Sequence, residues 1–317
     1  MRFSALIPVA CAMVAFVLSM LALFAGNKPG FMEDYNIMTL NTSTLGHVLV
    51  PTPTSSSSSS ASSTSSSLGS FISSLAQNIT NSIEGELASI EGDIADKLAQ
   101  TLGISQWYSL HFMDMCQGSY APNATAKHVH KNTTECSNQT AMYHFNLTQT
   151  LNDQLHRGGL NLNLSDINWP SEIQDSIDAA NTAMDATFIL FMIGIGAAGV
   201  SILAGLVAFL VSGSRLLAFG NWGLTTISFT ALLITAIILT VVQGKFVHAI
   251  NKNGNDIGIY AYRGTKYLII TWIAPALMFL ASLVWVFEFC IGRKQQKREY
   301  TEKASYTKRS KWSRSRI

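Results

Sequence analysis

Four long hydrophobic runs constrain this chain more than any other feature. The runs are Leu6–Ala25, Ala186–Val211, Trp222–Val242 and Tyr267–Phe287, and none of them contains a charged residue. Each run has about the 20 apolar residues that an α-helix needs to cross the hydrocarbon core of a bilayer. The pattern predicts an all-α membrane fold with four transmembrane helices and one large loop between the first and second spans.

The runs divide the chain into eight segments. The predicted segments are the first span (1–26), a large extracellular loop (27–185), the second span (186–211), a cytosolic loop (212–221), the third span (222–242), an extracellular loop (243–266), the fourth span (267–291) and a basic cytosolic tail (292–317). An alternative for the first run is a cleaved signal peptide, because Arg2 precedes it. Its length favours a retained span, since the apolar part of a signal peptide is usually only about 7–15 residues long.

Charge and glycosylation sequons indicate the orientation. Residues 27–185 contain 15 acidic and five basic residues, a net charge of −10, whereas residues 292–317 contain ten basic and two acidic residues, a net charge of +8. Basic segments next to a span stay in the cytosol. Seven Asn-x-Ser/Thr sequons lie in the large loop, at Asn41, Asn78, Asn123, Asn132, Asn138, Asn146 and Asn163. Both signals predict a glycosylated outer loop and cytosolic termini.

The large loop contains only two cysteines, Cys116 and Cys136. Two cysteines in an oxidising compartment predict a disulfide, which would contribute about 3 kcal/mol through the entropy of the unfolded chain. A metal site of Cys116, His128, His130 and Cys136 is the alternative, but the spacing does not match a common zinc site. We therefore expect no metal.

Three other parts of the loop have recognisable patterns. Residues 51–67 form a serine-rich spacer, either O-glycosylated or plain linker. Residues 70–103 predict an amphipathic helix, because apolar residues recur every three or four positions from Leu75 to Leu102. The apolar face of this helix must pack against the rest of the loop, a second copy of the chain or a membrane surface. Acidic residues on the opposite face disfavour contact with anionic lipid. Within the disulfide-bearing segment 104–150, the alternation in Ala141–Leu147 predicts a short strand.

The tail is a candidate for contact with anionic lipids of the cytosolic leaflet, since each basic residue near such a surface adds about 1 kcal/mol. Its basic residues are Arg293, Lys294, Lys297, Arg298, Lys303, Lys308, Arg309, Lys311, Arg314 and Arg316. The alternative is that this charge only sets the topology. Cys290, directly before the tail, is a candidate for palmitoylation.

Two stretches carry a resemblance to a known family. One reads WYSLHFMDMCQG and is followed by CSN; the other reads GNDIGIYAYRGTKYLIITW. The most specific positions are Leu110, His111, Cys116, Cys136, Ile257, Gly258, Ala261 and Gly264. Together with the order of spans, these stretches resemble the fungal Sur-seven/PalI family of claudin-like four-span plasma-membrane proteins.

The resemblance implies a structural or organising component of a fungal plasma-membrane domain, the eisosome or cortical patch, linked to endocytosis, cell-wall integrity and stress response. The expected partners are cortical scaffold proteins and the membrane itself, with a homo-oligomer as a further candidate. We expect no catalytic residue, no cofactor and no nucleic-acid partner. One alternative is a PalI-type accessory in ambient-pH or wall-stress sensing, which the short tail disfavours. A channel or transporter subunit is the other, which the uncharged spans disfavour.

Overall fold

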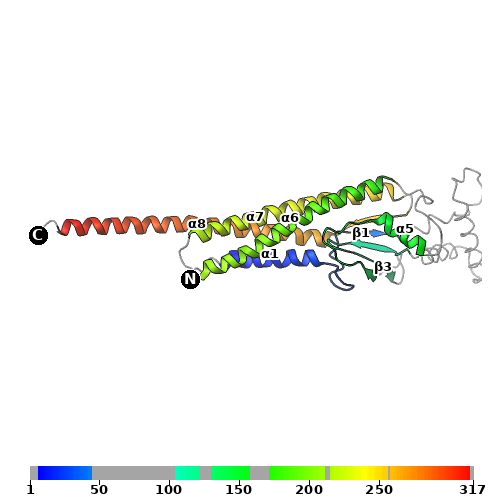
Figure 1. Cartoon of the computed structure of the whole chain (residues 1–317), viewed down its shortest axis with the longest axis horizontal. Helices are drawn as coiled ribbons and strands as arrows, with labels where there is room; N and C mark the ends of the chain where they lie inside the picture. The colour runs from blue at the N-terminus through cyan, green and yellow to red at the C-terminus, as the bar shows by residue number, and fades with distance from the viewer. Residues whose placement is uncertain are drawn as a thin grey trace, which may run out of the picture. The chain divides into compact units, whose positions relative to one another are not determined.

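The computed structural model describes residues 6–44, 104–121, 130–157, 171–210, 215–255 and 258–314. Its elements are α1 (Leu6–Phe24), β1 (Met38–Asn41), β2 (Trp107–Leu110), β3 (Met115–Ala121), β4 (His130–Cys136), α5 (Leu147–Arg157), α6 (Ser171–Leu210), α7 (Arg215–Asn253), β5 (Tyr260–Arg263) and α8 (Thr265–Arg314) (Figure 1). The predicted serine-rich spacer and the predicted amphipathic helix both lie outside the described residues.

The chain folds into two compact units. One, here called the helical unit, comprises residues 1–21, 189–236 and 269–317; the other, here called the sheet unit, comprises residues 22–188 and 237–268. Four helices are long and apolar enough to cross a membrane, namely Leu6–Phe24, Glu172–Leu210, Leu216–Asn253 and Thr265–Cys290. Each covers one of the predicted runs to within one residue, and the chain is therefore a multi-pass membrane protein. The helices α6 and α7 extend well beyond the runs themselves.

Small residues of α6 allow close helix packing in the helical unit. A Cβ atom at Gly205 would lie 2.5 Å from Val9 Cγ2 of α1, and one at Gly194 would lie 2.8 Å from the Leu232 side chain of α7. The hydroxyl of Ser228 donates a hydrogen bond of 2.8 Å to the Gly194 carbonyl. Small side chains let helix backbones approach within a bilayer, where lipid is as apolar as the helix surface.

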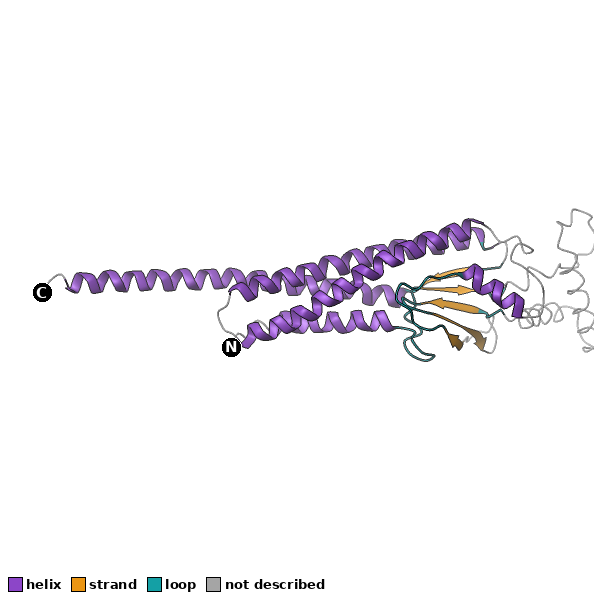
Figure 2. Ribbon diagram, in the orientation of Figure 1, coloured by secondary structure: helices purple, strands orange, loops and turns teal. Residues whose placement is uncertain are grey.

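The sheet unit is built around five antiparallel strands in the order β4-β3-β2-β1-β5 (Figure 2). The prediction of an all-α fold is therefore wrong for this unit. The short strand predicted over Ala141–Leu147 is also wrong, since this segment has a turn at its start and Leu147 already begins α5. The side chain of Asn181 on α6 bonds to the Phe145 backbone in this segment. Its oxygen accepts from the Phe145 N–H at 2.9 Å, and its amide group donates to the Phe145 carbonyl at 2.8 Å.

The edge strand β5 joins two parts of the chain, here called the inter-span segments: the one between α1 and α6 and the one between α7 and α8. It lies between α7 and α8, yet it pairs with β1 from the segment that follows α1, with Leu40 opposite Ala261. The side chain of Asn251 on α7 holds the Ala261 backbone on both sides, accepting from its N–H at 2.7 Å and donating to its carbonyl at 3.0 Å. Thr44 adds a hydrogen bond of 2.7 Å to the Gly258 carbonyl. Segments more than 200 residues apart therefore share one core.

Candidate functional site: the disulfide-braced hairpin

The structure contains the predicted disulfide between Cys116 and Cys136. The two residues lie directly opposite each other in the pairing of β3 with β4, so the strand register itself brings their side chains together. Cys116 is fully buried. The disulfide therefore fastens the polar, mostly exposed strand β4 to the core of the sheet.

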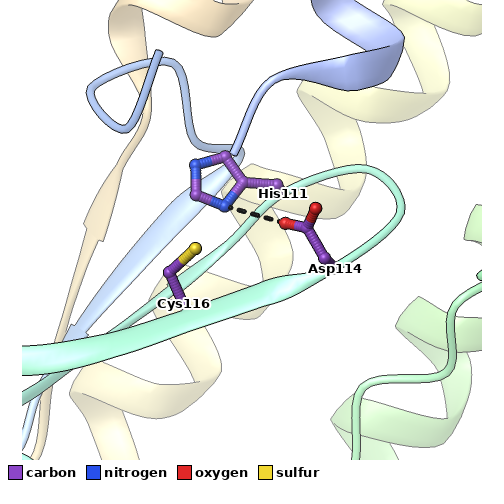
Figure 3. A group of neighbouring side chains, drawn as sticks. All are labelled: His111, Asp114 and Cys116. Carbon is purple, nitrogen blue, oxygen red and sulfur yellow. Dashed lines mark ion pairs between the residues drawn. The ribbon is translucent and has the colours of Figure 1, made fainter. Parts of the chain in front are cut away.

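A buried histidine and a buried aspartate form the turn between β2 and β3. Nδ1 of His111 lies 3.4 Å from Oδ1 of Asp114, and neither side chain is exposed to solvent. The backbone N–H of His111 also donates to the Asp114 carbonyl at 2.9 Å. Figure 3 shows the two side chains facing each other across this turn, with Cys116 beside them. A buried carboxylate is stable only with partners, and Gln139 supplies a second one with a hydrogen bond of 3.0 Å.

The chain that follows α1 closes over His111. Gly26 adopts a left-handed conformation with φ of +84°, and a Cβ atom there would lie 2.4 Å from the imidazole ring. Its carbonyl oxygen lies 3.3 Å from Cys116 Sγ. Nε2 of His111 lies 3.3 Å from the Glu33 carbonyl oxygen. His111 thus connects the β2–β3 hairpin with the segment that leaves the first span.

The same hairpin includes the closest arrangement of metal-binding residue types in the described part of the chain. Ligand atoms of His111, Asp114 and Cys116 lie within 4.8 Å of one another. The sulfur of Cys116 is bonded to Cys136, however, and a disulfide sulfur is not the thiolate that a metal needs. We therefore assign these residues a structural role. The alternative set from the sequence is not assembled either, because His130 and Cys136 lie at opposite ends of β4, about 20 Å apart in an extended strand.

Burial raises the pKa of Tyr143, which lies near the turn. The pKa of Tyr143 is raised above its ordinary value, chiefly by loss of hydration and further by the Asp114 carboxylate, while a hydrogen bond with Ser137 acts in the opposite direction. Tyr143 is therefore a neutral phenol at physiological pH. The Asp114 carboxylate in the turn is held by an imidazole and an amide.

Comparison with known proteins identifies the family. The family model described as "SUR7/PalI family" matches residues 4–284, which is most of the chain. The chain belongs to the SUR7/PalI family. The matched residues include all four predicted runs to within a few residues of the last one, both cysteines of the disulfide and strand β5. No curated protein matches the chain.

Four of the seven sequons of this SUR7/PalI protein lie in the described residues. Asn132, Asn138 and Asn146 are exposed. Asn41 differs, because it belongs to β1, an interior strand of the sheet, and its side-chain oxygen accepts hydrogen bonds from the N–H and the hydroxyl of Ser43, at 2.9 and 2.7 Å. The remaining three, Asn78, Asn123 and Asn163, lie outside the described residues, as does His128. Glycosylation itself stays a prediction.

At the other end of the chain, Cys290 is a free, exposed cysteine near the end of the apolar part of α8. The backbone of α8 continues as a helix to Arg314, through most of the basic tail, whereas Arg316 lies outside the described residues. Palmitoylation of Cys290 and lipid contact by the tail remain predictions.

Sequence reasoning found the cysteine pair but missed the role of Asp114 and Gly26. The signal for Asp114 was its place three residues after His111, in a stretch already notable for its resemblance to the family. No local signal marks Gly26, because its partner His111 is 85 positions away in the chain. Only the fold brings them together.

Proposed function

We propose that this SUR7/PalI protein is a non-enzymatic organising component of a plasma-membrane domain, of the eisosome or cortical-patch type. In this proposal both termini face the cytosol and the sheet unit lies outside the cell. The basic tail contacts anionic lipids or a cortical scaffold protein, and the links to endocytosis, cell-wall integrity and stress response follow from that position.

The observation that carries this proposal is the joint folding of the two inter-span segments. The pairing of β1 with β5 joins both segments in one sheet, and Asn251 of α7 holds β5 in place. The disulfide fastens the far edge of that sheet. A protein that holds a membrane domain together needs a stable surface for lateral contacts rather than a mobile loop. Family membership supports the same reading.

The test is the surface distribution of a C-terminally tagged copy in living fungal cells, with and without residues 293–317. We expect static patches at the cortex for the full chain and dispersal of the patches for the truncated chain. A tail with the same composition in scrambled order is the matched control. It retains patches if charge is the determinant and loses them if a scaffold protein reads a specific sequence. A uniform or internal-membrane distribution of the full chain would contradict the proposal.

The buried pair of His111 and Asp114 favours a second candidate, an accessory role in sensing external pH or wall stress. An imidazole next to a carboxylate, both without solvent contact, joins the β2–β3 hairpin to the segment after α1. This candidate predicts that His111→Gln changes the signalling output while the cortical distribution stays normal. Loss of both together would instead indicate a folding defect and would give this candidate no support.

A further inference from the structure

A polar pocket of ≈ 470 Å³ in the sheet unit has no role in the functions discussed so far. Residues of both inter-span segments line it, from β1, β3, β4 and β5 and from the start of α8. Thr39 and Asn36 are its buried polar residues, joined by a hydrogen bond of 3.2 Å from the Thr39 hydroxyl. A volume of several hundred Å³ is in the range of small-molecule sites, and the polar lining indicates a polar ligand.

The pocket concentrates positive charge. Lys131, Arg263 and Lys266 line it, and Asp34 is the one carboxylate among the lining residues. Asp34 and Lys266 form an ion pair of 2.5 Å in which both side chains are mostly exposed, so this pair is weak and free to rearrange. Thr265 and Lys266 also begin α8, whose N-terminal N–H groups favour an anion. The surplus of cations indicates an anionic ligand.

Among the described residues, no carboxylate forms an ion pair with Lys131, which is held by other contacts. Its Nζ atom donates to the Thr39 hydroxyl at 3.3 Å and lies 5.4 Å from the centre of the Trp107 ring. Partial burial lowers the pKa of Lys131, while the more distant Asp34 and Glu33 act in the opposite direction. A bound anion would therefore restore interactions that the ammonium group has lost from water.

Two tyrosines complete the lining. Burial raises the pKa of Tyr120 to about 12, with a further contribution from Tyr262, so Tyr120 remains a hydrogen-bonding phenol at neutral pH. The Tyr262 side chain is 55% exposed and lies opposite Thr39 in the pairing of β1 with β5. Phenol rings present an apolar face and a polar edge, which matches a sugar ring with C–H bonds on its face and hydroxyls on its edge.

We propose that this pocket binds a hydroxylated ring that carries a phosphate or carboxylate group, as an acidic saccharide does. The cations Lys131 and Arg263 contact the anionic group, the tyrosines cover the ring, and Thr39 and Asn36 hydrogen-bond with its hydroxyls. The same chemistry occurs in soluble or chain-borne acidic sugars and in the headgroup of an inositol phospholipid.

The test uses the full-length protein in detergent and follows tryptophan fluorescence, because Lys131 contacts Trp107. The probes are glucose 6-phosphate, glucuronate, glucose and inorganic phosphate. We expect saturation with at least one of the acidic sugars, and binding of glucose and of phosphate weaker by about tenfold or more, as expected when an interaction of about 1.4 kcal/mol is lost. Vesicles with and without phosphatidylinositol distinguish the lipid headgroup from a soluble sugar.

Variants test whether the pocket is the site. Lys131→Gln and Arg263→Gln should each weaken binding of the acidic sugar by about tenfold. Lys28→Gln, which removes an exposed charge of the same segment outside the pocket, should leave binding unchanged. Three results would each overturn the proposal. They are equal binding of phosphate and sugar phosphate, equal effects of all three substitutions, and no saturation by any probe at about 10 mM, a concentration beyond the usual range of weak binding.

Discussion

Gly26 allows a sharp test at the scale of a single residue, because Gly30 provides a matched control. Both glycines have positive φ values, +84° and +86°, but a Cβ atom at Gly26 would enter the His111 ring whereas one at Gly30 meets nothing within 4 Å. The conformational penalty for alanine is therefore shared, at about 1–2 kcal/mol. The clash is specific to Gly26 and adds about 1–3 kcal/mol.

We expect Gly26→Ala to lower the midpoint of thermal unfolding clearly more than Gly30→Ala does, with both proteins in the same detergent. Circular dichroism follows the transition. Equal effects of the two substitutions would show that the contact between Gly26 and His111 does not contribute to stability.

Asn41 is the sequon whose occupancy the structure disfavours. Its side chain bonds to Ser43, and it lines the pocket described above from the interior strand β1. A glycan on its Nδ2 atom would fill the pocket that Asn41 lines. We expect Asn41→Gln to leave the glycosylated mass unchanged in cells that add N-glycans, whereas Asn132→Gln, Asn138→Gln and Asn146→Gln each remove one glycan. Mobility before and after endoglycosidase treatment measures this, and a mass decrease for Asn41→Gln would contradict it.

At the scale of elements, the contact of α6 with α1 predicts opposite signs for two similar substitutions. Alanine favours a helix over glycine by about 1 kcal/mol. At Gly196, where a Cβ atom meets nothing within 4 Å, Gly196→Ala should therefore raise the unfolding midpoint. At Gly205 the Cβ atom would lie 2.5 Å from Val9 Cγ2, and overpacking of about 1–3 kcal/mol should outweigh the gain.

Thermal unfolding of the two variants in one detergent decides this comparison. If Gly205→Ala were as stabilising as Gly196→Ala, the α1–α6 interface would have room that the structure does not give it. The prediction depends on packing alone, since both positions lie within the same helix.

At the scale of the whole molecule, Asn251 of α7 holds strand β5, which pairs with β1 from the segment after α1. Asn251→Ala leaves the backbone N–H and carbonyl of the buried Ala261 without these partners, a loss of about 1–3 kcal/mol. Because β5 pairs with β1, we expect faster amide hydrogen exchange in both strands. Asn253→Ala is the control, since Asn253 bonds only within its own helix, to the Ala249 carbonyl.

Hydrogen exchange with mass spectrometry should show lower protection in peptides that cover Met38–Asn41 as well as Tyr260–Arg263 for Asn251→Ala. If only the β5 peptide changed, the two inter-span segments would be stable independently. That result would remove the main structural support for the proposal that they form one contact surface.

The sequence by itself determined the features that depend on composition and local order. An uninterrupted apolar run of about 20 residues has few solutions other than a membrane-spanning helix, so the four spans were predictable. The Cys116–Cys136 disulfide was predictable as well, because these are the only two cysteines of one segment. The family resemblance rested on short stretches that the family model then matched.

Only the tertiary structure decided the sheet, the buried turn and the pocket. Strands β1, β2 and β5 have four residues each, too few for a clear alternating pattern, and β4 is polar. Their pairing depends on partners far away in the chain, such as Leu40 with Ala261. The roles of Gly26, His111 and Asp114 follow from the same long-range contacts, because a residue's burial is set by what folds over it and not by its neighbours in sequence.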